Sequence, residues 1–109
     1  MSKAHERAVA DVFFALGDST RLSVVRRLGE AGALSATALS TGTKVTRQSI
    51  AKHLHVLEDA GLVTRERQGR EVLHSLETRR LEVARAFLDQ VSATWDRRID
   101  RLRSLVEEP

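Results

Sequence analysis

Residues 45–76, VTRQSIAKHLHVLEDAGLVTRERQGREVLHSL, decide which fold this chain adopts. Their first part predicts an amphipathic helix over residues 47–60, because apolar residues recur at helical spacing and leave a polar face opposite them. The apolar face consists of Ile50, Leu54 and Leu57. The Thr46 hydroxyl can cap the start of this helix, and Gly61 can end it. A helix with such a polar face fits the major groove of duplex DNA.

The second part of the stretch predicts a β-hairpin with a basic tip. The expected strands are residues 62–67 and 71–76, joined at Gln68-Gly69. Arg67 and Arg70 flank the tip of this wing. A helix that fits a groove, followed by an arginine-tipped wing, is typical of proteins that grip duplex DNA.

The positive charge of the chain is concentrated in the same region. Residues 44–70 hold six lysines and arginines against three acidic residues, so this segment accounts for the whole formal net charge of +3. A local positive field of this kind favours contact with phosphates. Gln48 can read adenine, and Lys52 can reach guanine or phosphate. The residues predicted to contact DNA are Lys44, Thr46, Arg47, Gln48, Ser49, Lys52, His55, Arg65, Arg67 and Arg70.

Helices are expected on both sides of this region. The first helix is expected over residues 3–16 and the last over about 78–107. The second is expected over 19–29, capped by Asp18, with Leu22, Val25 and Leu28 buried. A short third helix is expected to follow Ser35 and to be closed by Gly42. The predicted fold is therefore mainly α with a small β-hairpin, in the order ααααββα. We expect a single winged helix-turn-helix domain over residues 1–109, with the helix-turn-helix at about 35–60, the wing at 62–76 and the dimerisation helix at about 78–107.

The last predicted helix is too long for so small a domain to cover. Its apolar residues recur at helical spacing and predict an association surface, to which the first helix adds a phenylalanine. The residues predicted at the dimer interface are Phe13, Phe14, Phe87, Leu88, Val91, Trp95, Ile99 and Leu102. The alternative is that this stripe packs inside one subunit. A two-fold homodimer would present two helices to a palindromic operator.

With these elements in place, the chain resembles the ArsR family of winged-helix bacterial repressors over nearly its whole length. Residues 16–28, LGDSTRLSVVRRL, look like the opening signature of the family, and residues 50–63, IAKHLHVLEDAGLV, look like its recognition-helix core. The matching positions are Asp18, Thr20, Arg21, His53, Leu54, Val56, Leu57, Ala60, Gly61, Leu62, Val63, Gly69 and Arg70. Ala51 departs from the family, which commonly has serine there. The resemblance implies a repressor that occludes a promoter, often its own, and that dimerises through its first and last helices.

Many members of the family sense metals, but here the ligands are missing. The chain has no cysteine, and the stretch SATALST, residues 35–41, lacks the pair of cysteines that such members carry. The last helix has no histidine, and His53 and His55 point to different helix faces. We expect His53 to be a partly buried structural residue and His74 to pack beneath the hairpin. The resemblance is therefore to the branch that senses no metal, with no cofactor and with an effector, if there is one, unidentified.

Other classes of function find little support. No nucleophile–base pair or phosphate loop is present, so no enzyme and no catalytic residue are expected. The scarcity of aromatic residues argues against single-strand binding by base stacking. No signal peptide or membrane span is predicted, so the expected compartment is the cytoplasm. The alternative to a DNA-binding repressor is a winged-helix protein-interaction module that does not read DNA.

Overall fold

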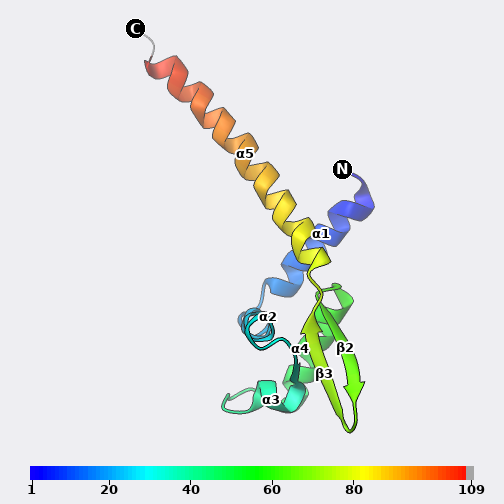
Figure 1. The fold of residues 1–109 in the computed structure, drawn as a ribbon. Helices are drawn as coiled ribbons and strands as arrows, with labels where there is room; N and C mark the ends of the chain where they lie inside the picture. The colour runs from blue at the N-terminus through cyan, green and yellow to red at the C-terminus, as the bar shows by residue number, and fades with distance from the viewer. Residues whose placement is uncertain (108–109) are drawn as a thin grey trace.

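The computed structural model describes residues 1–107 and contains five helices and three strands in that range (Figure 1). The elements are α1 (Lys3–Leu16), α2 (Ser19–Ala31), β1 (Leu34–Ser35), α3 (Ala36–Ser40), α4 (Arg47–Asp59), β2 (Val63–Gln68), β3 (Glu71–Leu76) and α5 (Arg79–Glu107). The predicted helices are confirmed, and the fold is a winged helix-turn-helix in which α3 and α4 form the helix-turn-helix and β2–β3 form the wing. Apolar side chains from the helices and the wing meet in one core, whose largest fully buried members are Val12, Leu28, Leu39, Leu54, Leu57 and Leu62.

The sheet has three strands rather than the predicted two. Its order is β1-β3-β2, and both pairings are antiparallel. The additional strand holds two residues, with Leu34 opposite His74 and Ser35 opposite Leu73. A strand of two residues is too short to show the apolar–polar alternation by which strands are recognised in a sequence. Only its pairing with β3 defines it. It fixes the start of the helix-turn-helix to the middle of β3.

The turn of the wing lies one residue later than predicted. Gln68 pairs with Glu71, so Gly69 and Arg70 form the two-residue connection. Gly69 has a φ of +63°, whereas Arg70 has a negative φ. Glycine in the first of the two turn positions is the pattern of a type II′ turn, whose twist suits a hairpin. Arg70 thus stands at the tip itself.

Of the three α2 residues predicted to be buried, Leu28 is confirmed, but the core face is centred differently from the prediction. Val24 and Leu28 are buried, whereas Leu22 is 52% exposed and Val25 is half-buried. Both sets of residues have helical spacing, so the wheel alone does not choose between them. The choice is made by packing, since α2 lies against α1, α4 and β3.

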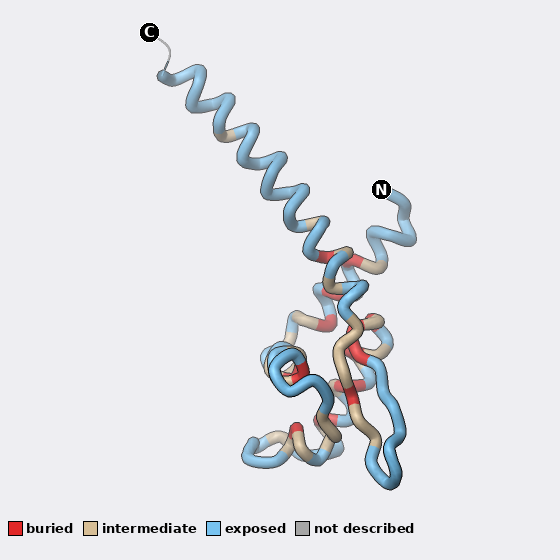
Figure 2. The backbone as a smooth tube through the Cα atoms, viewed as in Figure 1, coloured by how far each residue is buried: buried red, intermediate tan, exposed pale blue. Residues whose placement is uncertain are grey.

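The last helix projects far beyond the domain (Figures 1 and 2). Its 29 residues span roughly 43 Å at 1.5 Å per residue. Only its first turns pack against α1, where the Phe13 and Phe87 ring centroids lie 6.1 Å apart, and Ala84 is its one buried residue within the described range. Ile99 is half-buried, while Leu88, Val91, Trp95 and Leu102 are each at least 50% exposed. The subunit therefore leaves most of the apolar stripe uncovered.

The chain reverses sharply at Gly61, which allows a direct test of the link between helix and wing. Gly61 has a φ of +75°, and a Cβ there would lie 3.0 Å from Cγ of Arg80. We expect Gly61→Ala to lower the free energy of unfolding by roughly 1–2 kcal/mol from backbone strain, with the crowding against Arg80 adding to that. Gly42→Ala is the control, because Gly42 has a φ of +77° and no neighbour within 4 Å of the added carbon. Urea unfolding that showed equal destabilisation of the two variants would contradict the crowding against Arg80.

Candidate nucleic-acid interface

The recognition helix α4 is fixed at its start by a side-chain cap. The backbone N–H of Ser49 donates to Oγ1 of Thr46 over 3.1 Å, as the predicted cap requires. Ile50, Leu54 and Leu57 are buried, which confirms the predicted apolar face. Gln48, Lys52, His55 and Asp59 on the opposite side of the helix are exposed, so this polar face is open to a partner.

A polar cluster behind the helix ties it to the rest of the domain. Nη1 of Arg21 lies 3.2 Å from Nδ1 of His53, and Nε of Arg21 donates to the carbonyl oxygen of Ala15. Asp18 caps α2 by accepting from the backbone N–H of Arg21, and that hydrogen bond is the main reason why the pKa of Asp18 is lowered. His53 is thus a partly buried structural residue, as predicted. The three side chains, Asp18, Arg21 and His53, hold α4 in place against α1 and α2.

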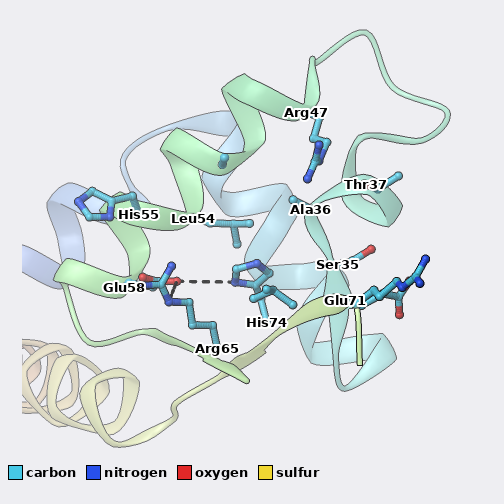
Figure 3. A pocket seen from close by; sticks show the side chains of 13 residues that line it. Ser35, Ala36, Thr37, Arg47, Leu54, His55, Glu58, Arg65, Glu71 and His74 are labelled. Carbon is cyan, nitrogen blue, oxygen red and sulfur yellow. Dashed lines mark ion pairs between the residues drawn. The ribbon is translucent and has the colours of Figure 1, made fainter. Parts of the chain in front are cut away.

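A hollow of about 410 Å³ separates the recognition helix from the wing (Figure 3). Arg47, Ala51, His55 and Glu58 line it from successive turns of α4, while α3 closes one end with Ala36 and Thr37. Arg65, Arg70, Glu71, Val72 and His74 line it from the wing. Four of the residues predicted to contact DNA, Arg47, His55, Arg65 and Arg70, therefore surround one concave surface, although they lie far apart in sequence.

The other predicted contacts lie outside this hollow. Gln48, Lys52 and Lys44 are exposed, and Arg67 is exposed on β2. Ser49 is half-buried and Thr46 uses its hydroxyl as the helix cap. Gln48 and Lys52 are one helical turn apart, so they share a second exposed strip of the recognition helix. The interface thus has two parts: the hollow and this strip.

Glu58 and His74, which also line the hollow, form a polar cluster that was not among the predicted contacts. Oε1 of Glu58 lies 3.9 Å from Nε of Arg65 and 3.7 Å from Nδ1 of His74 (Figure 3). His74 is buried beneath the wing, as its place on the strand predicted, and burial lowers its pKa, against the opposing effect of Glu58. Its Nδ1 has no hydrogen-bond partner among the described residues. The sequence carries no signal for this cluster, because the three residues belong to three different elements.

Within residues 1–107, no three histidines, cysteines or carboxylates come together as metal ligands. His55 instead lies next to Asp59, with 3.5 Å between Nε2 and Oδ2. In the same part of the chain, no helix is both long enough and apolar enough to cross a lipid bilayer.

Comparison with known proteins agrees with this geometry. Residues 16–66 match a family model described as a helix-turn-helix domain. The HTH-type transcriptional regulator YuzN of Bacillus subtilis is 48% identical over 54% of this chain and 71% of that protein. The HTH-type transcriptional regulator MJ1325 of Methanocaldococcus jannaschii is 34% identical over 60% of this chain and 72% of that protein. An ArsR-like transcriptional regulator from Rhodococcus sp. RHA1 has 36% identity and a TM-score of 0.81, over 95% of this chain and 97% of that structure.

The capped recognition helix, the basic wing and these relatives define a transcriptional regulator of the winged helix-turn-helix class. More narrowly, the chain belongs to the ArsR family, as its resemblance to that family implied.

Proposed function

We propose that this protein is a repressor that binds a specific palindromic operator as a homodimer and occludes a promoter, its own included. The main support is the convergence of Arg47, Arg65 and Arg70 around one hollow between the recognition helix and the wing. A row of cations beside a helix that fits the major groove suits the phosphate backbone next to that groove. Such a regulator would act where the chromosome lies, in the cytoplasm.

The two parts of the interface suit two kinds of contact. Gln48 and Lys52 project from the exposed strip of α4, where an amide or ammonium group can hydrogen-bond to base edges. Arg67 and Arg70 lie on or beside the tip of the wing and suit phosphates or the narrow minor groove. We assign sequence reading to the helix and most of the backbone affinity to the hollow and the wing.

The homodimer is proposed from the uncovered stripe on α5. Leu88, Val91 and Trp95 are half-exposed or more, in a subunit whose α1 reaches only the first turns of that helix. Burying each such side chain in the interface would stabilise the dimer by roughly 1.5–3 kcal/mol. We include Phe14, which is 70% exposed on α1, in the proposed interface because its ring is large, apolar and uncovered.

Selection of bound duplexes from a random pool, followed by footprinting, tests this proposal. We expect a palindrome whose half-site centres lie about one helical turn apart, on the order of 10 base pairs, because a two-fold dimer presents both recognition helices to one face of the DNA. Protection of a single asymmetric half-site at saturation would contradict the dimeric mode. Failure to enrich any sequence would contradict specific DNA binding.

A further inference from the structure

One carboxylate connects the recognition helix to both strands of the wing. Glu58 stands near the end of α4, and its side chain is only 19% exposed. Oε1 approaches Nε of Arg65 on β2 and Nδ1 of His74 on β3, at 3.9 and 3.7 Å. Arg65 and His74 face each other directly across the two strands. Glu58 therefore contacts one cross-strand pair from below.

The position of the Arg65 side chain depends on this contact. Strand β2 is exposed from Thr64 onward, and the Arg65 side chain is 68% exposed, so packing does little to fix its rotamer. Figure 3 shows the guanidinium turned back toward Glu58 at the hollow. Without the carboxylate, a long exposed side chain would sample many rotamers and would no longer keep that direction.

We propose that Glu58 is a positioning residue for DNA binding, which holds the Arg65 guanidinium at the hollow so that it meets a DNA phosphate. This inference rests on the proposed contact between this face and DNA. A carboxylate near DNA would by charge alone weaken binding. Here the ordered arginine outweighs that repulsion.

His74 and Arg65 lie next to the same Glu58 oxygen, so the protonation state of His74 affects how strongly Glu58 holds Arg65. Glu58 and Arg65 are the charges that act on the His74 ring. The other charged and titratable groups that line the hollow with it are His55 and Arg47 from α4, Arg70 from the turn and Glu71 from β3. The neighbouring residues on α3 and β1 carry no charge. Because burial lowers the pKa of His74, its ring is uncharged near neutral pH and leaves the carboxylate to Arg65. A proton on His74 would compete for the same carboxylate.

Glu58→Gln and Asp59→Asn form a matched pair for the test. Each removes one negative charge from the end of α4, but the Asp59 carboxylate pairs with His55 and not with the wing. Affinity for a duplex recovered by selection is measured at several salt concentrations. Both substitutions are made in a His55→Gln background, so that Asp59 has no partner at the interface to position, and there we expect Asp59→Asn to tighten binding. We expect Glu58→Gln to weaken it and to reduce the log–log salt slope by about 0.9 per subunit, or about 3.5-fold between 50 and 200 mM salt, because each subunit then neutralises one phosphate fewer.

Two further variants make the result specific to Arg65. Glu58→Gln should have no additional effect on the salt slope in an Arg65→Ala background. Glu58→Asp keeps the charge but is one methylene shorter, so it should no longer hold Arg65, and it serves if the glutamine variant does not fold. Equal tightening by Glu58→Gln and Asp59→Asn would overturn the positioning role. Absence of duplex binding by the unaltered protein would overturn the proposed function instead.

The pH profile separates positioning from a merely structural role. In a His55→Gln background, the affinity deficit caused by Arg65→Ala is followed from about pH 7.5 downward, until the His74 ring is seen by NMR to protonate, because its pKa lies below the ordinary histidine value of about 6.5. We expect the deficit to shrink at the lower pH, because protonated His74 takes Glu58 from Arg65. A deficit that stays unchanged after the His74 ring has protonated would overturn the part assigned to His74.

Discussion

Replacing Leu88 and Val91 together with aspartate is expected to give a monomer that no longer retains its operator. Both side chains are about half-exposed in the single subunit, so the change should leave the subunit folded. In the proposed dimer they would be buried, and an unpaired buried carboxylate is strongly unfavourable. Without the second recognition helix the gain from bivalent binding, which is roughly 10²- to 10⁴-fold in affinity, disappears. Light scattering and operator titration measure the two effects.

The control for this experiment adds the same charges to the other side of the helix. Gln90→Asp with Ala93→Asp places two carboxylates on exposed positions roughly opposite the apolar stripe. We expect this variant to remain dimeric and to keep its operator affinity within a few-fold of that of the unaltered protein. Repulsion between the added carboxylates and DNA accounts for that small loss. A Leu88 and Val91 double variant that was still a soluble dimer would move the interface elsewhere.

Substitutions in the recognition helix and in the wing are expected to affect DNA binding in different ways. Gln48→Ala should relax the sequence preference and weaken operator binding by roughly 1–3 kcal/mol for each base that the helix no longer reads, because Gln48 is exposed on the helix strip and has little role in folding. Arg70→Ala should weaken specific and random DNA more nearly alike. It should also reduce the salt slope by about 0.9 for each phosphate that a subunit no longer neutralises.

These two variants serve as each other's control, titrated on the selected operator and on a scrambled duplex over a range of salt. Both side chains are exposed, so thermal unfolding should change little in either variant. If Gln48→Ala left the operator preference intact while Arg70→Ala removed it, the division of labour between helix and wing would be reversed.

Local signals in the sequence were enough to predict the elements of the interface. The cap at Thr46, the stripe of Ile50, Leu54 and Leu57, and the end at Gly61 each depend on residues within a few positions of one another, and all three are confirmed. Whether each long element is a helix or a strand was predictable for the same reason. The assignment of ten residues to DNA contact and eight to the dimer interface remains a prediction, since a surface does not identify its own partner.

The sequence by itself determined the order of the long helices and the hairpin, the position of the recognition helix and the basic character of the wing, because periodicity, capping and charge are local properties of the chain. Tertiary structure alone decided which face of α2 is buried, where β1 pairs, and that Glu58 lies between Arg65 and His74. These features join residues that are distant in sequence. Their positions are fixed only when separate elements pack against one another, since helical spacing permits more than one buried face and a two-residue strand exists only through its partner.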